Sequence, residues 1–105
     1  MPETPKLTYH FDWDPIKARR NLADHKVSFQ LAGTLFGDSL AITVFDEGHS
    51  EGEERWITLG KAENGQYLVV VHTYQQSNPA HAAIRIISAR QATKREIQDY
   101  EEAPR

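Results

Sequence analysis

The order of helical and extended segments predicts an α+β domain with a helical hairpin packed on one face of an antiparallel sheet. Two capped helices follow one another early in the chain, and four extended segments with short connections come next. A third capped helix ends the chain. Counting an extended segment before the hairpin, the expected order is β-α-α-β-β-β-β-α, with four strands forming the sheet. The 105 residues make one domain, 1–105, which is long enough to bury its own core.

The first 13 residues predict a tail followed by an extended segment. Residues 1–8 are polar and contain two prolines, which predicts a flexible N-terminal tail. Aromatic and polar side chains then alternate over residues 9–13, and this period of two predicts a short edge strand.

Two helices are expected next, because their first residues have the chemistry of helix caps. Asp14 can accept a backbone N–H, and Pro15 fits the first helical position, so a helix should run to about His25. Ser28 should cap a second helix that reaches about Phe36. The short connection between the two helices predicts a helical hairpin.

The rest of the chain is expected to be mostly extended. Strands are predicted at residues 40–46, 55–61, 67–74 and 83–89, with a polar loop at 47–54 and a second loop at 75–82. Asn64 and Gly65 are the strongest hairpin signal in the chain. Thr93 and Glu96 have the spacing of a capping box, which predicts a final helix to about Glu102.

The composition excludes several functional classes. Cysteine is absent, which excludes disulfides, thiol catalysis and cysteine-ligated metal centres, and the five histidines have no metal-ligand spacing, so we expect neither metal nor cofactor. Twelve basic against 15 acidic residues give a net charge of −3, which opposes a strongly basic nucleic-acid coat protein. No apolar run reaches the roughly 18 residues of a membrane span, and we expect a cytoplasmic protein without membrane contact.

The hairpin at Asn64 predicts which side chains share a face of the sheet. A two-residue turn there pairs Arg55 with Tyr74, and a symmetric next hairpin pairs His72 with Arg85. One face then collects these four side chains. Arginines on nearby strands favour an anion between them, and a phosphate fits their forked geometry. The other, apolar face should receive the helices and holds Trp56, Thr58, Val69, Val71, Ile84 and Ile86.

Each of these polar residues also has a purely structural interpretation. Arg55 can pair with nearby acidic side chains, His72 can be a hydrogen-bonded core histidine, and Tyr74 can be edge packing. His49 lies in the polar loop and can be an ordinary loop residue. Arg90 precedes the last helix and can tie that helix to the sheet. The pattern of residues leaves both interpretations open.

Several segments, in their order along the chain, resemble the BrnT family of toxins. They are residues 11–15 with Lys17, Asn21 and His25, then 27–29, 52–57, 70–73, 84–90, 92–93, Glu96 and 100–101. The resemblance covers residues 9–102 and implies a RelE-like fold and a ribonuclease toxin of a type II toxin–antitoxin system. It also implies a BrnA-type ribbon–helix–helix antitoxin, through which alone the complex contacts operator DNA. The loop at 75–82 is longer than the family pattern.

Cleavage of RNA without a metal requires charge stabilisation at the phosphate and proton transfer at two oxygens. We therefore predict a metal-independent endoribonuclease that inhibits translation, in which Arg55 and Arg85 bind the phosphate and His72 transfers a proton. The secondary candidates are His49, Tyr74 and Arg90. The alternative is a non-catalytic interaction module whose arginine face receives an acidic or ribbon–helix–helix partner. A DNA-binding function of the chain itself is disfavoured, because residues 28–36 contain neither lysine nor arginine.

Overall fold

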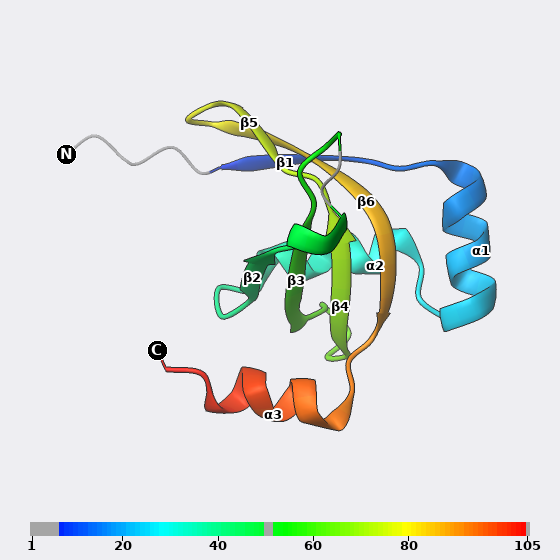
Figure 1. Cartoon of the computed structure of the whole chain (residues 1–105), viewed down its shortest axis with the longest axis vertical. Helices are drawn as coiled ribbons and strands as arrows, with labels where there is room; N and C mark the ends of the chain where they lie inside the picture. Colours follow the sequence, from blue (N-terminus) through cyan, green and yellow to red (C-terminus); the bar gives the residue numbers. More distant parts are fainter. Residues whose placement is uncertain (1–6, 50–51, 105) are drawn as a thin grey trace.

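The computed structural model describes residues 7–49 and 52–104 and confirms the α+β class (Figure 1). In these residues it has three α-helices, two short 3₁₀ helices and one six-stranded sheet. The helices are α1 (Pro15–His25), α2 (Phe29–Thr34) and α3 (Lys94–Glu102), with η1 (Leu35–Gly37) and η2 (Glu47–His49). The strands are β1 (Thr8–Asp12), β2 (Ile42–Phe45), β3 (Trp56–Lys61), β4 (Tyr67–His72), β5 (Gln75–Asn78) and β6 (His81–Gln91). None of the described helices is long and apolar enough to cross a membrane.

Each α-helix begins at the cap that the sequence predicts. The Asp14 carboxylate accepts a backbone N–H at the start of α1, and the Ser28 hydroxyl accepts one at the start of α2. The capping box of α3 is formed in both directions between Thr93 and Glu96. Lys26 ends α1 in the left-handed region with φ 60°, which turns the chain directly into α2. The helical hairpin is therefore a local consequence of these residues.

The sheet has six strands in place of the four predicted. The strand order is β1-β6-β4-β3-β2, and β5 pairs with the start of β6. Residues 75–82, predicted as a loop, instead form most of a hairpin between β5 and β6. The N-terminal strand joins the sheet beside β6 in parallel, while the other neighbouring strands are antiparallel. Because β1 already includes Thr8, the predicted tail at 1–8 is too long, and residues 1–6 lie outside the described residues.

The hairpin between β3 and β4 has a different register from the one predicted. Its loop contains three residues, 63–65, because the Ala62 N–H donates to the Gln66 carbonyl across it. Gly65 takes φ 88°, the left-handed conformation that such a loop requires and that glycine adopts without strain. Trp56 therefore lies opposite His72, and the whole pairing is shifted by one residue. A one-residue shift moves every side chain of a strand to the other face.

The predicted pairing of His72 with Arg85 is also wrong. His72 lies opposite Ile86, at a register shift between Val71 and His72. Ile84 and Ile86 are buried on the helix-covered face, so Arg85 between them points to the opposite side. Arg55 and Arg85 therefore share the side turned away from the helices, whereas His72 and Tyr74 lie on the helix-covered side, so the four predicted residues do not share one face.

The hydrophobic core lies between the sheet and the pair α1 and α2. Figure 1 shows α2 crossing one face of the sheet, α1 beyond β6, and α3 at the lower end of the strands. The core cluster consists of Val27, Phe29, Ala32, Leu35, Ala62, Leu68, Val70, Ile84, Ile86 and Ala89. Val69 and Val71, predicted for this face, instead lie on the face turned away from α2, where α1 and α2 leave the sheet uncovered. We call that surface the open face.

Candidate functional site

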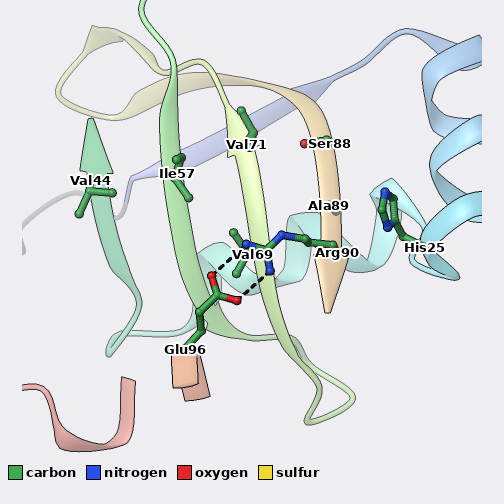
Figure 2. A pocket seen from close by; sticks show the side chains of 9 residues that line it. All are labelled: His25, Val44, Ile57, Val69, Val71, Ser88, Ala89, Arg90 and Glu96. Atoms are coloured by element: carbon green, nitrogen blue, oxygen red, sulfur yellow. Dashed lines mark hydrogen bonds and ion pairs between the residues drawn. The ribbon is translucent and has the colours of Figure 1, made fainter. Parts of the chain in front are cut away.

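The open face carries a hollow of about 360 Å³ (Figure 2). Its lining residues are His25, Val44, Ile57, Val69, Val71, Ser88, Ala89, Arg90 and Glu96. The four branched aliphatic side chains come from β2, β3 and β4 and form an apolar floor, whereas the polar groups come from β6 and the ends of α1 and α3. This combination of an apolar floor with a few grouped polar side chains is typical of a binding site.

Arg90 is the cation of this hollow, and Figure 2 shows its side chain crossing β4 toward Glu96. Arg90 Nη1 donates to Glu96 Oε1 at 2.7 Å, and Nη2 donates to Oε2 at 2.9 Å. These hydrogen bonds outweigh the effect of partial burial and hold the pKa of Glu96 at about 2. The hydrogen bond to Glu96 likewise raises the pKa of Arg90. A phosphate uses the same two N–H groups of an arginine, so it would compete with Glu96.

The irregularity of β6 brings two arginines to the open side. Arg85 and Arg90 are five residues apart, and in a regular strand residues an odd number apart point to opposite faces. The buried residues Ile86 and Ala89 are also an odd number apart, and both belong to the core cluster. The register shift against β4 lies between these two levels and reverses the alternation.

The two arginines predicted to bind phosphate are carried by β6 and by the residue before β3, and these two strands are not neighbours in the sheet. Arg85 Nη1 donates to Asp12 Oδ2 of β1 at 2.6 Å, and both side chains are exposed. Arg55 is half-buried just before β3, where its carbonyl accepts the Asp46 N–H at 2.9 Å. Alternation places Arg55 on the same side as Ile57 of the open face. β4 lies between β3 and β6, which separates the two backbones by roughly 10 Å.

His72 lies inside the helix-covered layer, with 2% of its surface exposed. Its Nε2 is 2.7 Å from the Thr58 hydroxyl and its Nδ1 is 2.9 Å from the Thr73 carbonyl. The Phe36 ring packs edge-on against the imidazole, with ring centres 4.8 Å apart. Burial lowers the pKa of His72, although the hydrogen bond to Thr73 acts in the opposite direction. These contacts fit the structural interpretation, a hydrogen-bonded core histidine.

The remaining two candidates also lie away from the hollow. His49 Nδ1 is 3.2 Å from Asp46 Oδ1 in the exposed η2 turn. Tyr74 follows β4 and its hydroxyl donates to Gln76 at 3.3 Å. The Tyr74 ring lines a second pocket on the helix-covered side, together with His72.

Sequence reasoning did not assign His25 and Ser88 to a site, although both line the hollow. A signal for Ser88 was present, because it lies two residues before Arg90 and therefore shares its face. His25 lies four residues after Asn21, on the same face of α1. Asn21 is buried and binds the β6 backbone at Ala89, so this face of α1 is fixed against the strand that carries Arg90.

Comparisons with known proteins identify the family of this chain and a solved structure with a similar fold. The family model described as "Ribonuclease toxin, BrnT, of type II toxin-antitoxin system" matches residues 13–96. No curated protein sequence matches the chain. Among solved structures, the chain is similar to the crystal structure of the Brucella abortus ribonuclease toxin, BrnT, at 24% sequence identity and a TM-score of 0.57. That match covers 87% of this chain and all of the other, and it shows that the two share a fold.

Proposed function

Because this chain belongs to the BrnT family of ribonuclease toxins of type II toxin–antitoxin systems, we propose that it cleaves RNA without a metal ion and thereby inhibits translation. The observation that carries the proposal is the family match over residues 13–96, a span that holds every strand lining the open-face hollow and also Glu96. The proposal includes a cytoplasmic location, as expected from the composition, and a RelE-like fold, as implied by the resemblance to the BrnT family.

The open face offers the groups that such a reaction uses. Arg90 presents two parallel N–H groups, and a phosphodiester that displaces Glu96 would receive both of them. Charge held at that position stabilises the negative charge that develops on the phosphate oxygens. His25 and Ser88 line the same hollow, where an imidazole can transfer a proton and a hydroxyl can orient the RNA. We therefore assign phosphate binding first to Arg90.

The other candidates take different places in this proposal. Arg85 is exposed on the open side, and Arg55 is half-buried on the same side, so both suit phosphates on either side of the cleaved bond. His72 is enclosed in the helix-covered layer and supports the sheet from there. The assignment of proton transfer accordingly passes from His72 to His25.

The partner we propose is a BrnA-type ribbon–helix–helix antitoxin that covers the open face. Val44 is 52% exposed and continues the apolar floor formed by Ile57 and Val71, which gives a protein partner a surface to bury. Occlusion of Arg90 by that partner would exclude RNA. Contact with operator DNA comes through the antitoxin in this scheme, and RNA is the nucleic acid that the toxin itself binds.

Growth after induction tests the proposal. The chain alone should stop growth and reduce intact RNA, whereas co-expression with its antitoxin should restore growth. The purified protein should cleave RNA equally well with EDTA present. Unimpaired growth with abundant folded protein would contradict the proposal and favour the non-catalytic interaction module, since Arg85 and Arg90 already bind carboxylates in this structure. Loss of cleavage in EDTA would overturn its metal-free part.

A further inference from the structure

A second pocket of about 360 Å³ opens on the helix-covered side of the sheet, at the end of β4. Its lining residues are Tyr9, Phe36, Thr43, Trp56, His72 and Tyr74. Five of these six side chains are flat rings, contributed by β1, η1, β3, β4 and the residues after β4. The described residues that line it do not include any that line the open-face hollow. We call this site the aromatic pocket.

The rings of the aromatic pocket are held in place by other rings. Phe36 packs edge-on against His72 at 4.8 Å between centres and is tilted against Tyr9 at 6.0 Å. Trp56 is supported from the side by Phe45, edge-on at 5.0 Å. Edge-to-face contacts of this kind fix ring orientation. The pocket is therefore preformed, and binding of a flat ligand does not require the entropy loss of ordering its walls.

A directed chain of hydrogen bonds ends at the rim of this pocket. The Thr73 carbonyl can only accept, so His72 carries its proton on Nδ1 and its Nε2 is an acceptor. Nε2 therefore receives the hydroxyl hydrogen of Thr58 at 2.7 Å. The Thr58 oxygen must then accept from Thr43, whose oxygen is 2.8 Å away. With its own hydrogen used in this way, the Thr43 oxygen can only accept from a ligand.

We propose that the aromatic pocket binds one unpaired base of single-stranded RNA and prefers a base with an exocyclic amino group. Stacking on aromatic side chains is the general means by which proteins hold unpaired bases. The amino group of adenine or cytosine can donate to the Thr43 oxygen, whereas uracil presents a carbonyl oxygen there. The inference rests on the proposed function, because the ligand is the RNA that the toxin cleaves.

The polar atom at the rim favours a base over a hydrocarbon side chain of a protein partner. A leucine or phenylalanine side chain would fill the rings but would bury the Thr43 oxygen without a donor, which costs free energy. A base satisfies both features at once, because its ring stacks while its amino group reaches the rim.

Tryptophan fluorescence can test this assignment directly. The chain has two tryptophans, and Trp13 packs on Phe29 outside the pocket, so Trp13→Phe leaves Trp56 as the only reporter. The probes are 2′-O-methyl hexaadenylate and hexauridylate, which bind but cannot be cleaved at a blocked 2′-oxygen. We expect saturable quenching of Trp56, with the adenylate binding about fivefold more tightly, as one additional hydrogen bond provides.

Variants of the pocket sharpen the test. Tyr74→Leu should weaken both oligonucleotides about tenfold, because it removes a stacking ring. Thr43→Val keeps the shape but removes the acceptor, so the two affinities should become equal with the uridylate affinity unchanged. Tyr67→Leu is the matched control, because it makes the same change at the other end of β4, where Tyr67 packs on Tyr100 and does not line the pocket. It should bind like the parent protein.

The outcomes separate this inference from the proposed function. Absence of quenching, or equal quenching in the Tyr74→Leu protein, would overturn the inference even if unmodified RNA is still cleaved. Quenching with the expected base preference would support it even if no RNA is cleaved, which would count against the function alone. A shift of Trp56 emission with N-acetylphenylalaninamide, without response to either oligonucleotide, would indicate a pocket for a protein side chain and would overturn the assignment.

Discussion

The Arg90 guanidinium and the Glu96 carboxylate form a two-pronged ion pair that joins β6 to the first turn of α3. The same carboxylate accepts the Thr93 N–H at 2.8 Å, so it serves the capping box as well. A phosphate that takes Arg90 must therefore displace the group that begins α3. Occupation of the open face and the start of the last helix are coupled through one side chain.

Replacement of Arg90 should separate catalysis from stability. We expect Arg90→Ala to lower the rate of RNA cleavage about 100-fold, because a fixed cation facing the developing charge contributes ~3 kcal/mol to the barrier. The melting temperature should fall by about a few degrees only, because 43% of the Arg90 side chain is exposed and solvent screens its pair with Glu96.

The control for this substitution is Arg95→Ala. Arg95 also binds a carboxylate, Asp99, but it lies exposed on α3 away from the hollow. Its loss should leave cleavage unchanged. Equal cleavage by the Arg90→Ala and Arg95→Ala proteins would contradict the assignment of Arg90.

The Glu96 carboxyl should make the fold sensitive to acid. Its pKa is about 2 in the folded chain against an ordinary value of 4.5, so the unfolded state binds the proton first. The stabilisation is fully present above pH 4.5 and is lost as the pH falls from 4.5 toward 2. Measured by urea unfolding across this range, the free energy of unfolding should fall more steeply with decreasing pH for the parent than for Glu96→Gln. The glutamine keeps a side chain able to cap α3. Identical pH profiles would remove Glu96 from acid unfolding.

The parts of the fold that depend on neighbouring residues could be predicted from the sequence. Asp14, Ser28 and Thr93 each cap a helix through atoms two or three positions away, and no distant contact is needed to recognise them. The strand β5 (Gln75–Asn78) could not be recognised in this way. Its four residues are polar and exposed, and they become a strand only because β6 supplies the pairing partners.

The prediction of the candidate site was wrong mainly because of one structural detail, the length of the loop between β3 and β4. Asn64 and Gly65 are compatible with a two-residue or a three-residue hairpin, and the choice between them reverses the faces of β4. His72 therefore moved from the expected site into the core. Arg90, a secondary candidate, lies on the open face because of a register shift between β4 and β6, and no residue type in the sequence predicts that shift.

His72 should act mainly on stability and should not transfer a proton during cleavage. His72→Gln should lower the free energy of unfolding by about 1–3 kcal/mol, because it disturbs buried hydrogen bonds to Thr58 and Thr73. Cleavage per folded molecule should fall much less than in the Arg90→Ala protein, because His72 lines the aromatic pocket and not the open-face hollow. A cleavage rate reduced 100-fold in a protein of parental stability would return His72 to the mechanism.

The lowered pKa of His72 also predicts a pH dependence near neutrality. The unfolded imidazole takes up a proton below about pH 6.5, whereas the buried ring resists it, so stability falls as the pH drops below that value. Measured by denaturant unfolding between pH 5 and 8, the free energy of unfolding should change less with pH for His72→Gln than for the parent. Equal dependence of the free energy of unfolding on pH in the two proteins would contradict this prediction.

Asn21 should be among the most sensitive positions of the fold, although its side chain does not line the open-face hollow. Its side chain donates to the Val27 and Ala89 carbonyls at 2.9 and 2.8 Å and accepts the Ala89 N–H at 3.0 Å. It thus closes the turn after α1 and takes the place of a neighbouring strand at one residue of β6.

Asn21→Ala leaves three buried backbone groups without partners and should lower the free energy of unfolding by about 3 kcal/mol or more. Urea unfolding measures this cost against Arg20→Ala, an exposed change on the same helix that should cost less than about 0.5 kcal/mol. Equal midpoints for the two variants would show that water satisfies these groups and that α1 is not fixed to β6 through Asn21.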